Sequence, residues 1–266
     1  MWSYRAIWRA HRFEWKLNQS EVRLSTVKER YENILERIAL SAQSARRDPD
    51  EVRLVVVTKR QPLNAILEAI NAGAQYLGEN YADEAYEKII VLKNQLKNNE
   101  LEAIQWHIIG HVQSRKASLV AEHFDYLHSL DSVKLSKRLD RFCTNSNRIL
   151  PVLLEMNVSG EETKSGWPAW DENQWEKLLP DIEIISNMSS LRIMGLMTMA
   201  PFFENPESAR PFFRRLRQLQ KYLYQHVADV DWCELSMGMS SDFEVAVQEG
   251  ATWVRIGQAI LGPRSR

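Results

Sequence analysis

The stretch VRLVVVTKRQPLNAILEAINAG, residues 52–73, contains one complete unit of the predicted fold. Its first six residues are mostly apolar and β-branched, which is typical of a strand buried on both faces of a parallel sheet. Residues 62–73 place apolar side chains at helical spacing and end in Gly73, a residue that favours a helix C-terminus. Lys59 lies between the two elements, so it is either a solvated end of the strand or an amine at the mouth of a site.

The same alternation of strand and helix continues along the chain. Seven more short apolar runs lie at residues 74–78, 104–110, 124–129, 149–157, 191–197, 231–236 and 252–257. Alternating strands and helices predict a parallel sheet, and eight such units suit a closed (β/α)8 barrel. An open doubly wound sheet is the alternative, but the chain has no Gly-x-Gly-x-x-Gly turn after its first strand. We therefore expect an α/β fold of the TIM-barrel type.

The segment before the first predicted strand bears on the domain organisation. A long charged and apolar helical pattern, residues 21–46, precedes the first strand, and no linker follows it. We expect a single barrel domain over residues 20–266 with this helix as an N-terminal addition. Residues 1–19 are basic and rich in tryptophan, and they lack the apolar core of a secretory signal. We expect a disordered tail or a start codon placed too early, with a weak interfacial helix as the alternative.

Composition narrows the class of protein. The formal net charge of the 266 residues is -1, so no overall positive field indicates nucleic-acid binding. No apolar run approaches the ~18 residues that a membrane span needs. The two cysteines, Cys143 and Cys233, lie far apart and suggest neither a disulfide framework nor a metal cluster, which fits a reducing cytoplasm. Cys233 alternates with apolar neighbours, so we expect it in the core.

Polar residues follow the predicted strands at the edge where a barrel builds its active site. The seventh run ends in SMGMS, residues 236–240, and the eighth is followed by Gly257. Small residues let the backbone approach an anion closely, and barrels often bind phosphate on these two loops. Serines at a helix start can also be ordinary N-caps, which is the alternative for either loop alone.

Arg255 is the charged residue of the eighth strand. Val254 and Ile256 alternate with it, so Arg255 is expected inside the barrel. A buried guanidinium needs either a ligand atom or a salt bridge, for which Glu155 and Glu234 are candidates. Together with Lys59 and a phosphate-binding loop, this arginine suits a phosphorylated aldehyde that forms a Schiff base. Pyridoxal 5′-phosphate (PLP) is the first candidate, and a sugar phosphate of a Schiff-base aldolase is the second.

Six motifs extend this interpretation to a family. They are LVVVTKRQP, LGENY, WHIIGHVQSRK, LPVLLEMNVSGEETKSG, LRIMGLMTMAP and LSMGMSSDFEVAVQEGATWVRIGQAILGPR. In this order they resemble the pyridoxal phosphate homeostasis proteins, whose fold is the barrel domain of alanine racemase. The resemblance runs from about Val22 to Arg264.

The resemblance implies a role for each site residue. It makes Lys59 the lysine of the internal aldimine, Arg255 the residue that faces the pyridine nitrogen, and Asn80 a neighbour of the cofactor ring. The phosphate-binding motif falls on Ser236, Gly238, Met239 and Gly257. The chain departs from the usual family pattern at Thr58, Arg60 and Gln258, where Ser, Thr and Thr are common.

The resemblance further implies a cytoplasmic protein that holds PLP for intracellular vitamin B6 homeostasis and has no reaction of its own. An amino-acid racemase is the alternative, but alanine racemase takes one acid–base group from a second domain. The chain ends at Arg266, soon after the barrel, so we expect no such domain. An aldolase of this kind usually carries its lysine on a late strand. A barrel whose cofactor site has decayed is a further alternative.

Partners and metals complete these expectations. We expect PLP as the cofactor, apo forms of PLP-dependent enzymes as recipients, a monomer, and no nucleic-acid or membrane partner. His107 and His111 have a spacing that would suit a metal on a helix, but they fall on a strand and its loop. We therefore predict packing or capping histidines and no metal site.

Overall fold

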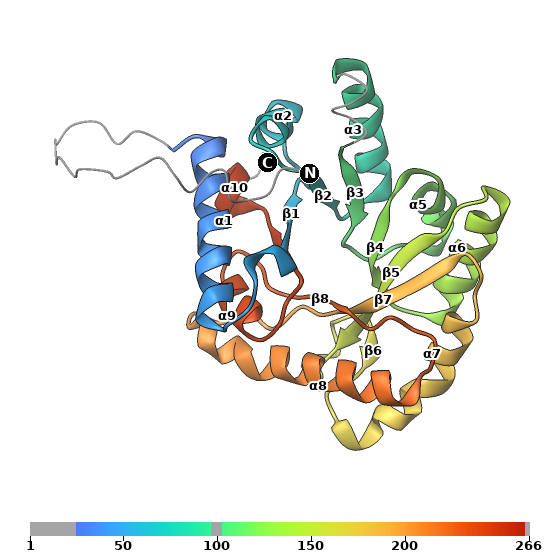
Figure 1. Ribbon diagram of the computed structural model, residues 1–266. Coiled ribbons are helices and arrows are strands. Elements are labelled where there is room, and N and C mark those ends of the chain that lie inside the picture. Colours follow the sequence, from blue (N-terminus) through green and yellow to red (C-terminus); the bar gives the residue numbers. More distant parts are fainter. Residues whose placement is uncertain (1–24, 97–102, 264–266) are drawn as a thin grey trace.

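The computed structural model describes residues 25–96 and 103–263 (Figure 1). Within these ranges nine parallel strands form one sheet, and eight of them close into a barrel in the order β4-β3-β2-β1-β9-β8-β7-β5, with β4 also paired to β5. The strands are β1 (Arg53–Val57), β2 (Tyr76–Glu79), β3 (Gln105–Ile108), β4 (Tyr126–Leu130), β5 (Leu150–Asn157), β6 (Trp167–Pro168), β7 (Leu191–Met197), β8 (Glu234–Ser236) and β9 (Trp253–Ile256). The short β6 pairs only with β5. The barrel prediction is confirmed, and each of the eight predicted apolar runs overlaps one of its strands.

Helices surround the strands, as Figure 1 shows. The α-helices are α1 (Val27–Ser44), α2 (Leu63–Asn71), α3 (Ala82–Gln95), α5 (Ala117–His123), α6 (Val133–Asn145), α7 (Leu179–Ser186), α8 (Arg210–His226), α9 (Phe243–Gln248) and α10 (Gln258–Leu261). Short 3-10 helices are η2 (Pro49–Glu51), η3 (Ser114–Lys116), η4 (Glu172–Leu178) and η5 (Pro206–Ala209). None of the helices in the described ranges has the length and apolar character to cross a bilayer.

Helix α1 is the predicted addition before the first strand. It begins after Thr26, whose hydroxyl accepts a hydrogen bond from the Glu29 amide while the Glu29 carboxylate accepts one from the Thr26 amide. This capping box satisfies amides that a helix start leaves without partners. The helix lies against α2, α9 and α10 on the outside of the barrel (Figure 1). The predicted N-terminal extension, residues 1–19, lies outside the described residues.

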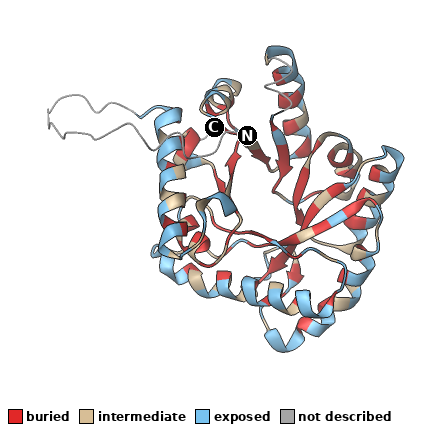
Figure 2. Ribbon diagram, in the orientation of Figure 1, coloured by how far each residue is buried: buried red, intermediate tan, exposed pale blue. Residues whose placement is uncertain are grey.

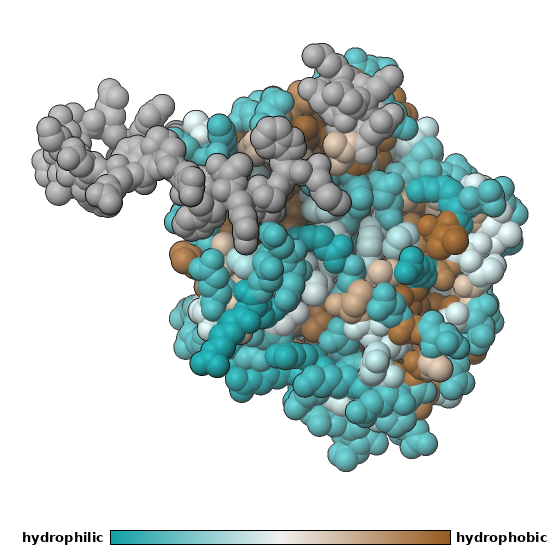
Figure 3. Space-filling model, in the orientation of Figure 1, coloured by the Kyte–Doolittle hydropathy of each residue, from teal (hydrophilic) through white to brown (hydrophobic). Residues whose placement is uncertain are grey.

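Two apolar layers form on opposite sides of the barrel wall. In β1, Leu54 and Val56 pack toward the helices, whereas Val55 and Val57 belong to a second cluster that also holds Trp253 of β9. Figure 2 shows the strands largely buried and the outer helix faces exposed. The face drawn in Figure 3 is mostly hydrophilic, with hydrophobic residues in separate groups. The alternation of side chains along each strand therefore separates an interior layer from an outer one.

The cysteines test one further expectation. Both are free; Cys143 is buried, but Cys233 is exposed, so its predicted core position is wrong. Its neighbours Trp232 and Glu234 are buried instead. The Cys233 amide bonds the Asp231 carbonyl just before β8, and burial alternates along this segment so that Cys233 falls on its exposed side.

Candidate functional site

Adjacent strands bring the predicted site residues to one side of the barrel mouth. Lys59 follows β1, Asn80 follows β2, Ser236 ends β8, and Arg255 and Gly257 lie at the end of β9. These four strands are consecutive neighbours in the barrel, in the order β2-β1-β9-β8. Because all of them are parallel, their carboxyl ends meet at one edge.

A tight turn carries Lys59 out of β1. The Gln61 amide donates to the Thr58 carbonyl at 3.1 Å, which makes Lys59 and Arg60 the central residues of the turn. Arg60 has a φ of 54°, a left-handed conformation that glycine adopts more readily than arginine. Lys59 is half-buried and lies two residues after Val57, which belongs to the interior cluster of the barrel.

A buried ammonium group supports this turn from helix α3. Lys88 Nζ donates to the Thr58 carbonyl at 2.8 Å, to Glu79 Oε1 at 2.7 Å and to Glu84 Oε1 at 2.7 Å. The Thr58 hydroxyl also donates to Glu79 Oε1, and the Arg60 amide to Glu84 Oε1, both at 2.7 Å. We call Thr58, Glu79, Glu84 and Lys88 the Lys88 cluster.

The two carboxylates of the Lys88 cluster differ in environment. Burial raises the pKa of Glu79, and the nearby Lys88 ammonium opposes this only in part. Burial also disfavours the charged form of Glu84, but its hydrogen bonds with Lys88 and the Arg60 amide outweigh that and lower its pKa. Glu84 is therefore held as the anion that both donors need.

Arg255 lies inside the barrel as predicted and is 4% exposed. Its Nη1 donates to Ser236 Oγ at 2.5 Å and its Nη2 donates to the Thr198 carbonyl at 2.9 Å. The proposed alternative, a salt bridge to Glu155 or Glu234, is not among the ion pairs of the described residues. Glu234 accepts hydrogen bonds from Arg53, Tyr126 and Trp253 instead. Burial lowers the pKa of Arg255 to about 10, so it is charged at neutral pH.

Two histidines extend the contacts of Arg255 into the barrel. The Ser236 hydroxyl lies 2.8 Å from His128 Nδ1, and His128 Nε2 lies 2.9 Å from His107 Nδ1. Burial lowers the pKa of His107 to about 3 and that of His128 well below its usual value, so both rings are neutral. His111 is exposed and its Nδ1 lies 2.6 Å from Asp131 Oδ2. The prediction that His107 packs in the interior is confirmed.

Two glycines allow close backbone approach at the ends of β8 and β9. Gly238 has a φ of 95°, and a Cβ there would lie 2.6 Å from Ala246 Cβ and 3.0 Å from Phe243 Cα. At Gly257 a Cβ would lie 3.1 Å from the Val57 carbonyl oxygen, so this turn rests against the end of β1. Gly238 thus has no room for a side chain, and at Gly257 a Cβ would need the end of β1 to shift slightly, so Gly257 lies directly beside the strand that leads to Lys59.

Not all of the backbone amides near these glycines are available to bind a phosphate. The Met239 amide donates to Asp242 Oδ1 at 2.6 Å, so the protein itself uses this predicted phosphate donor. Burial raises the pKa of Asp242, against the effects of the Met239 amide and Arg255. The amides of Gln258 and Ala259 begin α10, where a helix supplies no acceptor of its own. The donors of this region and the nearby Lys59 amine fit a phosphorylated aldehyde.

Asn80 lies at a cleft beside this group. The cleft has a volume of about 370 Å³ between the loops that follow β2 and β3, and its lining includes Asn80, Tyr81, His111, Arg115 and Lys116. A Cβ at Gly110 would lie 2.8 Å from Asn80 Cα, so glycine lets the two loops touch. Asn80 therefore stands at the border between the cleft and the end of β2.

Comparison with known proteins assigns this chain to a family. A family model described as "Alanine racemase, N-terminal domain" matches residues 31–265. The chain is 36% identical over 241 residues to the pyridoxal phosphate homeostasis protein of Vibrio alginolyticus, covering 91% of this chain and 99% of that protein. This chain belongs to the pyridoxal phosphate homeostasis protein family.

Solved structures agree with that assignment. PipY of Synechococcus elongatus, a structure with PLP bound, has a TM-score of 0.70 and 34% identity, covering 86% of this chain and all of that one. An alanine racemase of Clostridium difficile has a TM-score of 0.62 at 9% identity, which shows a shared fold. It covers 86% of this chain and 59% of the racemase.

Some residues around the site were not indicated by the sequence motifs. Lys88 and Glu84 lie outside all of the sequence motifs, and Glu79 occurs only within the LGENY motif. The spacing of Glu84 and Lys88, four residues apart on a helix, is a visible signal for an ion pair. The contact of Lys88 with the Thr58 carbonyl has no such signal, because it joins α3 to the turn after β1.

Proposed function

We propose that this protein binds PLP and takes part in the intracellular homeostasis of this cofactor. Lys59 Nζ attacks the cofactor aldehyde, a C=N bond forms, and the aldehyde oxygen leaves as water. The observation that carries the proposal is the contact of the Gly257 turn with the end of β1. This contact brings the turn at Gly257 close to the lysine, which supports a site for a ligand with both a phosphate and an aldehyde.

The remaining predicted residues surround the two ends of this ligand. We place the phosphate against Gly257 and the loop that holds Ser236, Gly238 and Met239, and the pyridine nitrogen at Arg255. The bond of the Met239 amide to Asp242 means that other amides supply most of the phosphate contacts. Asn80 borders the ring on the cleft side. These assignments rest on the family motifs and on the adjacency of the strands that carry them.

The finer proposal is that the protein holds PLP without using it as an enzyme does. PLP stabilises a carbanion best when its ring nitrogen is protonated. A guanidinium has donors only and cannot accept that proton, and its charge disfavours a pyridinium beside it. Arg255, fixed by Ser236 and the Thr198 carbonyl, therefore keeps the ring nitrogen unprotonated.

A titration tests the binding proposal. PLP added to the protein should produce the visible absorbance of a Schiff base, and pyridoxal without the phosphate should bind far more weakly. The Lys59→Ala variant should lose the visible band and keep some affinity for pyridoxine 5′-phosphate, which has the phosphate but no aldehyde. Equal binding of pyridoxal and PLP would contradict the phosphate assignment.

An exchange experiment tests the absence of catalysis. The PLP-loaded protein is incubated with L-alanine in deuterated water, and the Cα–H signal is followed by NMR. We expect no exchange at the rate of an ordinary enzyme, ~1 per second or faster. Exchange at that rate that depends on Lys59 would make the protein a racemase-type enzyme.

The cellular role follows from release of the cofactor. We propose a monomer in the cytoplasm that passes PLP to apo forms of PLP-dependent enzymes, in line with its family and its two free thiols. Mixing the loaded protein with an apo-aminotransferase should restore the activity of that enzyme. Failure to restore activity while free PLP does so would contradict the role as a donor.

A further inference from the structure

The Lys88 cluster holds the main chain on both sides of Lys59. The peptide group before Lys59 contains the Thr58 carbonyl, which accepts from Lys88 Nζ at 2.8 Å. The peptide group after Lys59 contains the Arg60 amide, which donates to Glu84 Oε1 at 2.7 Å. The orientations of these two peptide groups define the backbone angles of Lys59. One network therefore fixes both angles at the residue that is proposed to carry the cofactor.

All the hydrogen-bond donors of the Lys88 ammonium group have partners in this arrangement. An ammonium group has three donors, and those of Lys88 go to Thr58, Glu79 and Glu84. Its side chain is 11% exposed and that of Glu79 is fully buried. Burial of these charges is costly, and a buried ion pair is weak evidence for a purely stabilising role.

The turn itself needs external support. Arg60 adopts a φ of 54°, a conformation that costs free energy for a residue other than glycine. The Glu84 carboxylate that accepts from the Arg60 amide is itself held by Lys88 on the same helix. A strained turn persists only where surrounding contacts determine it, and such turns are found at functional sites.

We propose that Lys88, acting through Glu84 and the Thr58 carbonyl, is a positioning residue that presents the Lys59 amine to the aldehyde of the bound cofactor. This inference rests on the proposed function, because it assigns a role toward the same lysine. The cluster governs covalent capture of PLP and not the non-covalent affinity of the phosphate site, which lies on β8 and β9.

The main variant is Lys88→Met, which keeps the length of the side chain and removes the ammonium. The double variant Lys88→Met with Glu79→Gln also removes the buried carboxylate that would otherwise lack its cation, and it carries the test if the single variant does not fold. Lys93→Met is the matched control, because Lys93 is exposed on the same helix. Glu84→Gln keeps an oxygen that can accept from the Arg60 amide, whereas Glu84→Ala removes it.

Two measurements separate positioning from general damage. The first is the rate at which the visible Schiff-base band forms after PLP is mixed with the protein. The second is the affinity for pyridoxine 5′-phosphate, which cannot form the bond. We expect Lys88→Met and the double variant to form the band at least ~10-fold more slowly, the scale of losing one charge-assisted hydrogen bond. Their affinity for pyridoxine 5′-phosphate should match that of the wild type.

The glutamate variants and the control complete the test. Glu84→Ala should slow capture, Glu84→Gln should restore most of it, and Lys93→Met should behave as the wild type. Capture by the double variant at the wild-type rate would overturn the inference while leaving PLP binding intact. A parallel loss of pyridoxine 5′-phosphate affinity would also overturn it, because the cluster would then support the whole site. A wild type that forms no band would contradict the proposed function instead.

Discussion

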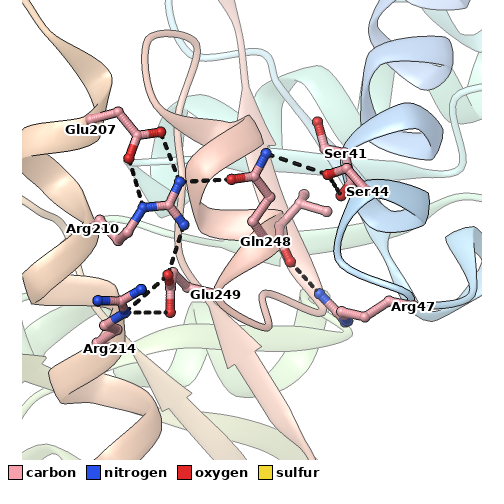
Figure 4. Close-up of polar contacts among 9 residues, drawn as sticks. Ser41, Ser44, Arg47, Glu207, Arg210, Arg214, Gln248 and Glu249 are labelled. Atoms are coloured by element: carbon pink, nitrogen blue, oxygen red, sulfur yellow. Dashed lines mark hydrogen bonds and ion pairs between the residues drawn. The ribbon is translucent and has the colours of Figure 1, made fainter.

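Two networks in this barrel, each centred on a cation, have similar hydrogen bonds but different roles. In the Lys88 cluster one ammonium joins two carboxylates and a main-chain carbonyl. In the second network, which we call the Arg210 cluster, Arg210 bonds Glu207, Gln248 and Glu249, and Arg214 also bonds Glu249 (Figure 4). Hydrogen bonds to Glu207 and then Glu249 raise the pKa of Arg210. Each cation is thus held by several acceptors at about 2.7 Å.

The difference lies in what each network holds. The Arg210 cluster joins η5 and the start of α8 to the end of α9 on the outer face of the barrel, and the side chain of Glu207 is 58% exposed. The Lys88 cluster holds the turn that contains Lys59, and its central pair is largely buried, with the Lys88 side chain 11% exposed and that of Glu79 fully buried. The number of ion pairs therefore does not reveal function, whereas the main-chain atoms that an ion pair fixes do.

The largest expected effect is on the Lys88 cluster. Lys88→Met leaves the buried Glu79 without its cation and should lower the free energy of unfolding by about 3 kcal/mol or more. Urea unfolding followed by circular dichroism measures this loss. The double variant with Glu79→Gln should recover part of it. A loss no larger than that of Arg210→Met would remove the contrast between the two clusters.

Glu155 shows what burial does to a carboxylate that lies in neither cluster. Burial, with a smaller effect of Asp131, raises its pKa from 4.5 to about 7, and Arg255 and His111 oppose the change. Between these pH values the folded protein keeps a proton that the unfolded chain releases, so stability falls as the pH rises. Glu155→Gln should remove this fall. Above pH 7 the free energy of unfolding of this variant should be higher than that of the wild type by a value on the order of 3 kcal/mol. A wild-type stability that rises with pH owing to Glu155 would contradict the assignment.

A substitution at Gly238 tests whether a change at the site is transmitted to α9, which lies beside the Arg210 cluster. This glycine packs against Ala246 of α9, the helix that ends directly before Glu249. Gly238→Ala should lower the free energy of unfolding by about 2 kcal/mol more than Gly73→Ala, because it adds a steric clash to the strain of a left-handed backbone. Gly73 is the matched control: its φ is 104° and a Cβ there meets nothing within 4 Å. Equal losses, measured by thermal unfolding, would show that α9 adjusts freely.

The smallest expected effect is at the Arg210 cluster. Arg210→Met should lower the free energy of unfolding by about 1 kcal/mol, the scale of a partly exposed ion-pair network. PLP capture should keep its wild-type rate, since the cluster touches neither the Lys59 turn nor the strands that lead to it. A slowed capture, measured by stopped-flow absorbance, would mean that the outer network also supports the site.

The barrel was predictable because its strands are short apolar runs and its helices have apolar residues at helical spacing. Lys59, Ser236 and Gly257 could be located because a parallel barrel places strand ends at one mouth. The interior position of Arg255 followed from simple alternation.

The partners of these residues were not predictable in the same way. For Arg255 the sequence left open a ligand atom or a salt bridge to Glu155 or Glu234, and it did not indicate the bonds to Ser236 and the Thr198 carbonyl. A carbonyl acceptor exists at every residue, so the sequence does not distinguish one from another. The Lys88 cluster was not predicted for the same reason. Cys233 was misplaced because the segment before β8 buries the residues on either side of it and exposes the cysteine.

The identity of the modified lysine tests the central claim most directly. The wild-type protein is loaded with PLP, reduced with borohydride, digested, and mapped by mass spectrometry. The account predicts the pyridoxyl group on Lys59. Lys116, which lies at the neighbouring cleft, and Lys164, which bonds the Met199 carbonyl, are the internal controls. Modification mainly at either of these lysines, or none at all, would contradict the account.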